Sequence, residues 1–579
     1  MPPASSSTKS ARKVTGLRYW MLRVLDECDR VRADFASDPV HDLRVSLRRC
    51  RSMADGLIAM DPDPDWKAMK KTGKRLFQRL GALRDVHVMI EWIEKLHPAE
   101  GKAGPSGTKI SVARAPSPAW PQSAQDSGNI GHTPAAEDRN EGQNYDPRDP
   151  AAHALLQILA RREAEQKLEA LAALEEFDRK QWRQWAKSLP QRAGRIRPGS
   201  ALFKHLALER WTEGRHLHQL ALRHRSQTAL HSLRIGIKRF RYIVENFLPA
   251  EHQAWNRDLK KMQDLLGEVH DLDVLWATAV SAQIFPDADS RLRWREKILA
   301  ERNERIASYR AAMTGPEALW SVWRAALPQG KQIQTLATRR MKLWANALDP
   351  DFAHSERVAP LALQLHDGLL AAGLLRSTLG SNNSTADGKN AGARSSLLAA
   401  ALLHDVGKSM GNKGHHKTSL ELIKAHGTPL GWKPEDMQRA ALVARFHCGA
   451  LPTRRHKALR DLLPAEQELT IQLAAILRLA NACDASHDGH IRRIQIENAK
   501  IEAATRRNKN GANGFRLKTS SRLANNQAIV IAAEGYTASS FTAQAIAAER
   551  HLLETVLHRP VMVRPMKNKA PRFVARQIH

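Results

Sequence analysis

The sequence is poor in residues on which several protein classes depend. Its 579 residues include only four cysteines, Cys28, Cys50, Cys448 and Cys483, and no two of them form a CxxC pair. This spacing argues against a disulfide scaffold or a zinc ribbon and fits a reducing compartment. We find no apolar run long enough to span a bilayer, and the polar N-terminal segment lacks the apolar core of a signal peptide. We therefore expect a cytoplasmic protein that does not enter a membrane.

Acidic residues are too few to balance the basic ones. The chain has 90 Lys and Arg against 60 Asp and Glu, a formal net charge of +30 and a pI near 10.3. This excess predicts attraction to polyanions such as nucleic acid, anionic membranes or polyphosphate, and says little about the fold. Tyrosine is scarce, whereas Ala, Leu and Arg abound, so local propensities favour helix. The length predicts two or more domains.

Helical periodicity covers most of the chain and is interrupted in two places. It runs over residues 14–98 and from about 151 to 345, and the segment between them is rich in Pro, Gly, Ser and Asn. That composition predicts a disordered insertion near 99–150. A second low-complexity segment, 377–395, is expected to be a loop. Beyond about residue 490, short β-like runs flank one helix, which predicts a small α+β end piece.

An internal repeat organises the first half of the chain. HDLRVSLRRCRSM begins at His41, and HSLRIGIKRFRYI begins at His231. In both, the His is followed by Arg at +3, Arg or Lys at +7 and Arg at +10. On a helix this spacing aligns four side chains along one stripe, while the intervening apolar residues fall on a face that can pack inward. The two stripes are His41, Arg44, Arg48 and Arg51, and His231, Arg234, Lys238 and Arg241.

A second pair of segments repeats at nearly the same offset. KKTGKRLFQRLGALRDVHVM matches RDLKKMQDLLGEVHDLDVL, which aligns Lys71 with Arg257, Lys74 with Lys260, Gly81 with Gly267, and Asp85 with Asp271. Two copies of a four-helix unit would place both stripes on related surfaces and form a positive groove. A polyanion would bind it with strong salt dependence, because binding releases condensed counterions. The alternative is a solvated basic face of a helical bundle.

These repeats resemble the CHAD family, the conserved histidine α-helical domain, over about residues 14–335. The resemblance implies a duplicated four-helix-bundle module that binds inorganic polyphosphate in the cytoplasm, with polyphosphate granules as one expected place of association. It implies a ligand-binding set made of both stripes and the aligned cations, namely His41, Arg44, Arg48, Arg51, Lys71, Lys74, His231, Arg234, Lys238, Arg241, Arg257 and Lys260.

The second half contains an ordered set of histidines and aspartates. LLAAALLHDVGKSMGNKGHH places His404 and Asp405 at the end of an apolar helix, with His354 upstream and Asp484 downstream. This set resembles the HD-domain phosphohydrolases. The resemblance implies a divalent metal (Mn, Mg, Fe, Co, Ni or Zn) held by His354, His404, Asp405 and Asp484. A metal activates water for attack on phosphorus, and Lys408 would stabilise charge on phosphate oxygens, so Asp405 and Lys408 are the expected catalytic residues.

Three further histidines, His415, His416 and His447, are candidates for a second metal site in the same region. The alternative for all of these residues is structural: they would cap or bridge helices in an apolar core.

A closer resemblance covers about residues 345–565. RVAPLALQLHDGL, ALLHDVGKSMGNKGHHKTSLELI, LVARFHCGALP and LAAILRLANACDASH resemble the C-terminal half of the Ppx/GppA exopolyphosphatase family. Those enzymes carry their hydrolytic machinery in an N-terminal actin-like half, whereas here the CHAD-like module stands in its place. A second departure is Thr418, where the family often has His.

The sequence therefore predicts a mainly all-α protein in three parts. They are a CHAD domain over 14–335 with the insertion near 99–150, an HD domain over 345–490, and a small α+β subdomain over 491–565. The favoured function is polyphosphate binding joined to a metal-dependent phosphohydrolase that acts on polyphosphate or on another phosphate ester or anhydride. The alternative is a non-catalytic polyphosphate-binding protein in which the HD half only extends the surface.

Nucleic-acid binding ranks last among the functions considered. We find no helix-turn-helix, zinc-finger or RRM signature, and the 14 tryptophans are spread along the chain. The sequence leaves the oligomeric state open.

Overall fold

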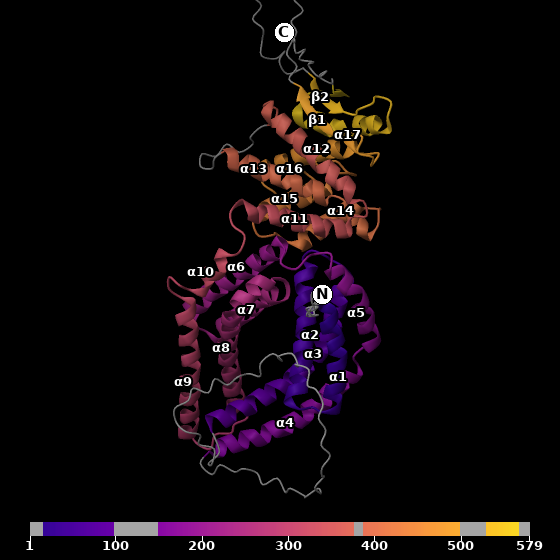
Figure 1. The fold of residues 1–579 in the computed structure, drawn as a ribbon. Coiled ribbons are helices and arrows are strands. Elements are labelled where there is room, and N and C mark those ends of the chain that lie inside the picture. The colour runs from indigo at the N-terminus through magenta and orange to yellow at the C-terminus, as the bar shows by residue number, and fades with distance from the viewer. Residues whose placement is uncertain (1–15, 98–148, 376–385, 498–527, 567–579) are drawn as a thin grey trace, which may run out of the picture. The chain divides into compact units, whose positions relative to one another are not determined.

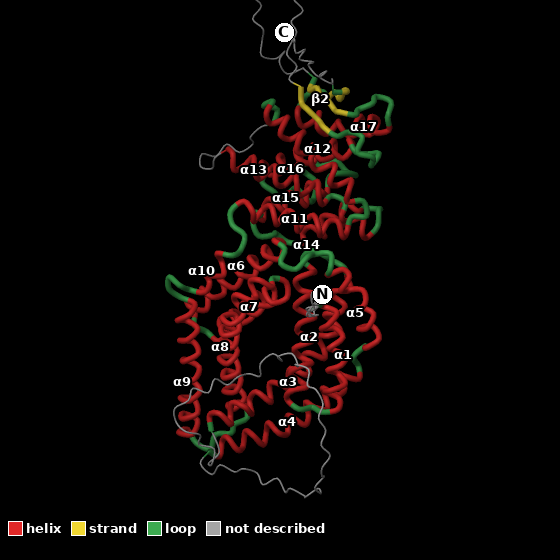
Figure 2. Tube along the Cα trace, in the orientation of Figure 1, coloured by secondary structure: helices red, strands yellow, loops and turns green. Residues whose placement is uncertain are grey.

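A computed structural model describes residues 16–97, 149–375, 386–497 and 528–566. In these residues helices dominate, and strands form one three-stranded sheet near the C-terminus (Figure 2), so the predicted mainly all-α class is confirmed. Most of the predicted insertion, 98–148, lies outside the described residues. The predicted loop over 377–395 is wrong in its second part, because a helix begins at Ala386. No helix in the described part of the chain is long and apolar enough to cross a membrane.

The chain divides into two compact units, each with its own core. The first unit comprises Met1–Met53, Lys67–Pro198 and Arg210–Ala326, and the second comprises Ala54–Trp66, Gly199–Glu209 and Leu327–His579.

Ten helices lie before Leu327 among the described residues, and their lengths follow the sequence repeat (Figure 1). Helices α3 and α8 each have 33 residues, α4 and α9 each have 26, and α2 and α7 have 22 and 21. The closely similar lengths of these three pairs agree with a duplicated helical module, although α1 and α6 (17 and 24 residues) and α5 and α10 (15 and 7 residues) differ. The bounds are α1 Leu17–Ala33, α2 Ser37–Ile58, α3 Pro64–Leu96, α4 Pro150–Glu175, α5 Arg179–Ala193, α6 Ala201–His224, α7 Gln227–Phe247, α8 Pro249–Ser281, α9 Ala288–Met313 and α10 Leu319–Ala325.

Local sequence signals define where these helices begin. Side chains of Asp149, Ser226 and Asp287 cap α4, α7 and α9 by accepting hydrogen bonds from backbone N–H groups three residues later. Pro249 opens α8, where its fixed φ fits the first helical turn.

The second unit continues with helices α11 to α17 and the sheet. Helix α16 packs against α12, α15 and α17, and its buried face belongs to one large apolar cluster. Strand β2 lies in the middle of the sheet, antiparallel to β1 and parallel to β3, and α17 connects β2 to β3, which confirms the predicted strands. The bounds are α11 Lys331–Leu348, α12 Phe352–Ala371, α13 Ala386–Leu403, the 3-10 helix η1 Val406–Met410, α14 His415–His426, α15 Pro434–Arg445, α16 Pro464–Cys483, β1 Arg493–Glu497, β2 Ile529–Glu534, α17 Phe541–Leu557 and β3 Val561–Pro565.

Candidate functional site

The two basic stripes lie on α2 and α7 as their spacing predicts. All eight stripe residues are half-buried, whereas the apolar residues between them are fully buried: Leu43, Leu47, Cys50, Leu233, Ile237 and Phe240. The flanking cations Lys71, Lys74 and Arg257 are exposed, and Lys260 is half-buried. Each helix therefore anchors one face in the core and leaves its cations at the edge of solvent.

Helices α2 and α7 contact each other directly. Arg49 pairs with the buried Glu245, and Asn246 donates from Nδ2 to Ser52 Oγ over 2.9 Å. The Arg48 guanidinium lies 5.9 Å from the centre of the Tyr242 ring. These contacts hold the two equivalent helices together, so cations of both repeats belong to one surface region.

Cations of both repeats affect the pKa of Asp85. Desolvation by the surrounding protein raises the pKa of this carboxyl, while Arg44 from one repeat and Arg234 and Lys238 from the other act in the opposite direction. One carboxyl group can respond to both stripes only where their charges come close together. The predicted joining of the two stripes is thus supported by electrostatics as well as by helix contacts.

A glycine in each repeat lies beside a stripe arginine. Arg44 donates from Nη1 to the carbonyls of Leu80 and Gly81 over 3.2 and 3.1 Å, and a Cβ added to Gly81 would lie 3.7 Å from the guanidinium. At the equivalent Gly267, an added Cβ would lie 3.9 Å from Arg234 Nε. The aligned glycines therefore lie against a stripe arginine at the same place in both repeats, and each position has room for a Cβ.

His270, which the sequence analysis did not select, lies beside the stripe residue His231. Its Nδ1 lies 3.4 Å from Nδ1 of His231, and their rings are 4.7 Å apart. Burial, assisted by the charge of Arg234, lowers the pKa of His270 to about 4, and burial also lowers the pKa of His231. In the alignment of the two repeats, His270 corresponds to Arg84. This match between a histidine and a basic residue was the signal in the sequence that could have identified His270.

The second unit gathers its histidines and aspartates at the ends of several helices. His354 lies in the first turn of α12, His404 and Asp405 follow α13, His415 begins α14, and His447 follows α15. All are buried except His415, which is half-buried. Buried charged groups need partners, so this cluster requires an electrostatic explanation.

Three of the histidines share one orientation. Nδ1 of His404, His415 and His447 lies 2.7 to 2.8 Å from the backbone carbonyl three residues earlier in the chain. Because Nδ1 donates to these carbonyls, Nε2 is the nitrogen of each ring that faces the interior of the cluster. The Nε2 atoms lie 3.3, 3.2 and 3.4 Å from the carboxylate of Asp405. The four side chains therefore converge on one point.

Asp405 is the centre of this cluster. Burial by itself raises its pKa, but the contacts with His404, His415 and His447 outweigh burial and hold the pKa far below the usual range. Lys408 donates to Oδ2 over 2.6 Å. Among the described residues, Oδ1 of Asp405 and Nε2 of His404 are buried without a hydrogen-bond partner. Both atoms have polar neighbours at 3.2 to 3.3 Å but no well-aligned hydrogen bond, an arrangement that a metal ion would satisfy.

The predicted ligand set is only partly brought together. His354, His404 and Asp405 each offer a ligand atom within 4.8 Å of the others. Asp484 instead accepts from Nδ1 of His354 over 2.7 Å and from Arg357 Nε over 2.9 Å, and its other oxygen accepts from the Gly489 N–H. In this arrangement Asp484 orients His354.

A second group contains a residue that the sequence analysis did not consider. His415, His447 and Cys448 also offer ligand atoms within 4.8 Å of one another, and His416 is not part of this group. Burial alone raises the pKa of Cys448, but His415 and His447 lower it to about 6. Contact with Asp405 raises the pKa of His415 to about 10. The position of Cys448 directly after His447 was the signal available in the sequence.

Gly407 allows this cluster to form. A Cβ at this position would lie 2.1 Å from the His415 carbonyl oxygen and 2.6 Å from the Ser419 nitrogen. Ser419 Oγ accepts from the Gly407 N–H over 2.9 Å and donates to the His404 carbonyl over 2.7 Å. The close approach of η1 and α14 therefore places His415 beside Asp405.

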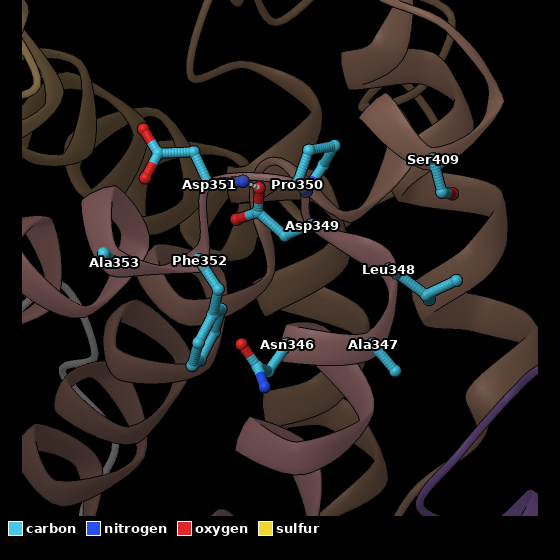
Figure 3. Close-up of a pocket in the computed structure, with 9 residues that line it drawn as sticks. All are labelled: Asn346, Ala347, Leu348, Asp349, Pro350, Asp351, Phe352, Ala353 and Ser409. Atoms are coloured by element: carbon cyan, nitrogen blue, oxygen red, sulfur yellow. Dashed lines mark hydrogen bonds between the residues drawn. The ribbon is translucent and has the colours of Figure 1, made fainter. Parts of the chain in front are cut away.

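A cavity of about 610 Å³ lies near this cluster, at the turn between α11 and α12 (Figure 3). It is lined by residues 346–353 and by Ser409, which follows Lys408. Its ionisable side chains are Asp349 and Asp351, and two carboxylates disfavour a phosphate ligand. We therefore assign the candidate site to the histidine cluster and not to this cavity.

The molecule thus joins a helical module with a shared basic surface to a helical unit with a buried histidine–aspartate cluster. Comparison with protein families matches a CHAD domain to residues 21–280, and domain III of the Ppx/GppA phosphatases to residues 338–532. The chain therefore combines a CHAD domain with a Ppx/GppA-type domain III, as the sequence resemblances predict. Together the two domains support a polyphosphate-related function. A comparison with curated proteins finds no match.

Proposed function

We propose that this protein binds inorganic polyphosphate on the basic surface of its CHAD domain and that its second unit is a metal-dependent phosphohydrolase. The substrate of the second unit would be polyphosphate or another phosphate ester or anhydride. One observation carries the catalytic part: three histidines present their Nε2 atoms to the buried carboxylate of Asp405.

The donor set fits a divalent metal. Imidazole nitrogens with one carboxylate suit Mn, Fe, Co, Ni or Zn better than Mg. His354, His404 and Asp405 would hold the ion, and Asp484, itself held by Arg357, would orient His354 through Nδ1. Nε2 of His354 would exchange its contact with Asn481 Oδ1, at 2.7 Å, for the ion. When bound, such an ion supplies a Lewis acid and a nucleophile derived from water at neutral pH.

Lys408 has a distinct role in this proposal. Its ammonium group touches Asp405 and its side chain is 23% exposed, so it lies between the buried cluster and solvent. A cation there attracts the phosphate group and stabilises charge that develops on its oxygens during bond cleavage.

The binding surface follows from the duplicated stripes. The joined cations of α2 and α7 match the repeating negative charge of polyphosphate, and arginine forks suit phosphate oxygens. The proposal assigns both stripes and the flanking cations Lys71, Lys74, Arg257 and Lys260 to this surface.

A non-catalytic alternative is favoured by the hydrogen bonding of two carboxylates. Lys408 already occupies Oδ2 of Asp405, and both oxygens of Asp484 accept hydrogen bonds. If these pairs persist, the second unit contributes only structure and binding surface.

Metal content and phosphate release separate the two possibilities. Both would be measured for the full chain and for Asp405→Ala, with polyphosphate, nucleotides and guanosine polyphosphates as substrates and several divalent metals. Asp461→Ala is the matched control, because Asp461 is 85% exposed and lies outside the cluster. We expect Asp405→Ala to lose metal and turnover while the control keeps both. Equal turnover in all three proteins would leave the non-catalytic alternative.

A further inference from the structure

Four ligand-type atoms converge beside the proposed catalytic ion. Nε2 of His415 lies 3.1 Å from Nε2 of His447 and 3.7 Å from Sγ of Cys448. Oδ1 of Asp405 lies 3.2 Å from the first nitrogen and 3.4 Å from the second. The set comprises two imidazoles, one thiol and one carboxylate oxygen.

The orientation of the two rings directs both Nε2 atoms to the same point. Nδ1 of His415 and of His447 are each taken by a backbone carbonyl, of Asn412 and Ala444 respectively. Two Nε2 atoms 3.1 Å apart need positive charge beside them, supplied either by ring protons or by a metal ion that replaces those protons. The negative charge of the Asp405 carboxylate attracts such a cation further.

Four of the separations within this set match those around a tetrahedral ion. Bonds of about 2.0–2.2 Å to nitrogen or oxygen and about 2.3 Å to sulfur, at tetrahedral angles, separate nitrogen or oxygen ligands by about 3.3–3.5 Å and nitrogen from sulfur by about 3.6 Å. The observed separations of 3.1, 3.2, 3.4 and 3.7 Å lie within a few tenths of an ångström of these values.

The segment that carries two of the ligands is firmly positioned. Arg478 on α16 donates to the carbonyls of Phe446 and Gly449, which flank His447 and Cys448, and pairs with Glu549 on α17. Cys448 is half-buried, which gives an ion a route from solvent. The other three cysteines are fully buried.

We propose that His415, His447, Cys448 and Oδ1 of Asp405 form a second metal site that contains a thiolate and takes a borderline-soft divalent ion such as zinc. The thiolate selects against Mg, which prefers oxygen ligands. Asp405 would then be shared, with Oδ1 toward this ion and Oδ2 toward His404. This site goes beyond the proposed function and stands whether or not the protein is a hydrolase.

Cobalt(II) is the probe that tests the thiolate directly. Metal-free full-length protein would be titrated with Co(II), with bound metal counted by elemental analysis and the near-ultraviolet thiolate-to-cobalt charge-transfer band recorded. Cys448→Ser is the test variant because it preserves the size of the side chain. Cys483→Ala is the matched control, since Cys483 is buried in the core of the same unit and burial raises its pKa to about 12.

We expect the wild type to show the charge-transfer band and to bind two ions. Cys448→Ser should lose the band and weaken the affinity for one ion by at least about tenfold, the lower end of what loss of even an outer-shell partner costs. The control should match the wild type. Circular dichroism would establish that both variants fold.

Two results would overturn the proposal. One is wild-type protein that binds cobalt without the band, which would leave the first metal site and the proposed hydrolase intact. The other is a band that survives in Cys448→Ser. Absence of any bound cobalt would contradict this site and the metal-dependent function together.

Discussion

The basic surface of the first unit and the histidine cluster of the second unit arrange charge in opposite ways. The first spreads many cations along helices, and the second gathers ligand atoms around one carboxylate. In the first unit, like charges lie half-buried along helix faces and are spread over two repeats, as on α2 and α7. In the second, side chains from the ends of α12, α13, α14 and α15 converge within a few ångströms of Asp405. A surface of repeated cations suits a long anion, whereas convergent buried donors suit a single small cation.

This contrast determines what a substitution should do in each region. A site spread over many cations should lose affinity gradually, and a convergent buried site should fail as a whole when one element moves.

The largest effect is expected at Gly407. Gly407→Ala places a methyl group against the backbone of His415 and Ser419, so η1 and α14 must separate. Overpacking against backbone should destabilise the second unit by about 3 kcal/mol or more and should abolish metal binding. Chemical denaturation and elemental analysis check both expectations. Normal metal content in this variant would show that the cluster does not depend on the close approach.

A smaller, graded loss is expected in the first unit. Arg44→Ala combined with Arg234→Ala should weaken polyphosphate binding and reduce the slope of log affinity against log salt by about 1.5–2, because two cations no longer displace counterions.

The matched control for that pair is Arg75→Ala with Arg239→Ala. It removes the same charge from arginines that pair with Glu176 and Glu213 outside the stripes. A control slope that falls as much as the test slope would mean that net charge, and not the stripes, determines binding.

The two regions should respond oppositely to acid. A polyanion favours the protonated forms of His231 and His270, whose pKa values are low in the free protein, that of His270 about 4. Polyphosphate affinity should therefore rise as the pH falls from 7 toward 5, and less so in His270→Gln. Metal affinity should fall over the same range, because protons compete for the imidazoles of the cluster. Calorimetric titrations at several pH values measure both affinities. If polyphosphate affinity and metal affinity changed in the same direction with pH, the predicted contrast between the two regions would be wrong.

Stability provides a further test of the His231–His270 pair. Since the pKa of His270 is about 4 in the folded chain and near 6.5 when unfolded, the unfolded chain takes up a proton first. Its contribution should therefore lower stability as the pH falls from about 6.5 to 4. In His270→Gln, the denaturation midpoint should decline less steeply over this pH window. An unchanged decline would mean that groups other than His270 cause the loss of stability.

The smallest effect is expected at Gly267. A Cβ there meets Arg234 Nε at an ordinary 3.9 Å, so Gly267→Ala should stabilise α8 by about 0.5–1 kcal/mol through helix propensity. Gly267→Ala adds a methyl group where there is room for it, whereas Gly407→Ala adds one against the backbone of a neighbouring helix. The denaturation midpoint measures the change, and a large loss would contradict the tolerance.

More of the arrangement in the first region can be predicted from the sequence, for a physical reason. Helical periodicity alone places His41, Arg44, Arg48 and Arg51 on one face, so the stripe needs no tertiary information. His270 was missed because its nearness to His231 depends on how α7 packs against α8.

In the second region, order along the chain identified His354, His404 and Asp405 but not the direction of each lone pair. That direction depends on backbone carbonyls and on which neighbours take up hydrogen bonds. Asp484 accordingly contacts His354 and Arg357, and Cys448 joins His415 and His447. The role of Asp484 as a metal ligand stays a prediction.

The most direct test of the account is phosphate release by the metal-free full chain as divalent metal is added back, with polyphosphate binding measured in parallel. We expect turnover to rise with metal content in the wild type and to be absent in Asp405→Ala, while both proteins bind polyphosphate equally. Turnover that is independent of metal, or equal in the two proteins, would contradict the assignment of the histidine–aspartate cluster as the catalytic centre.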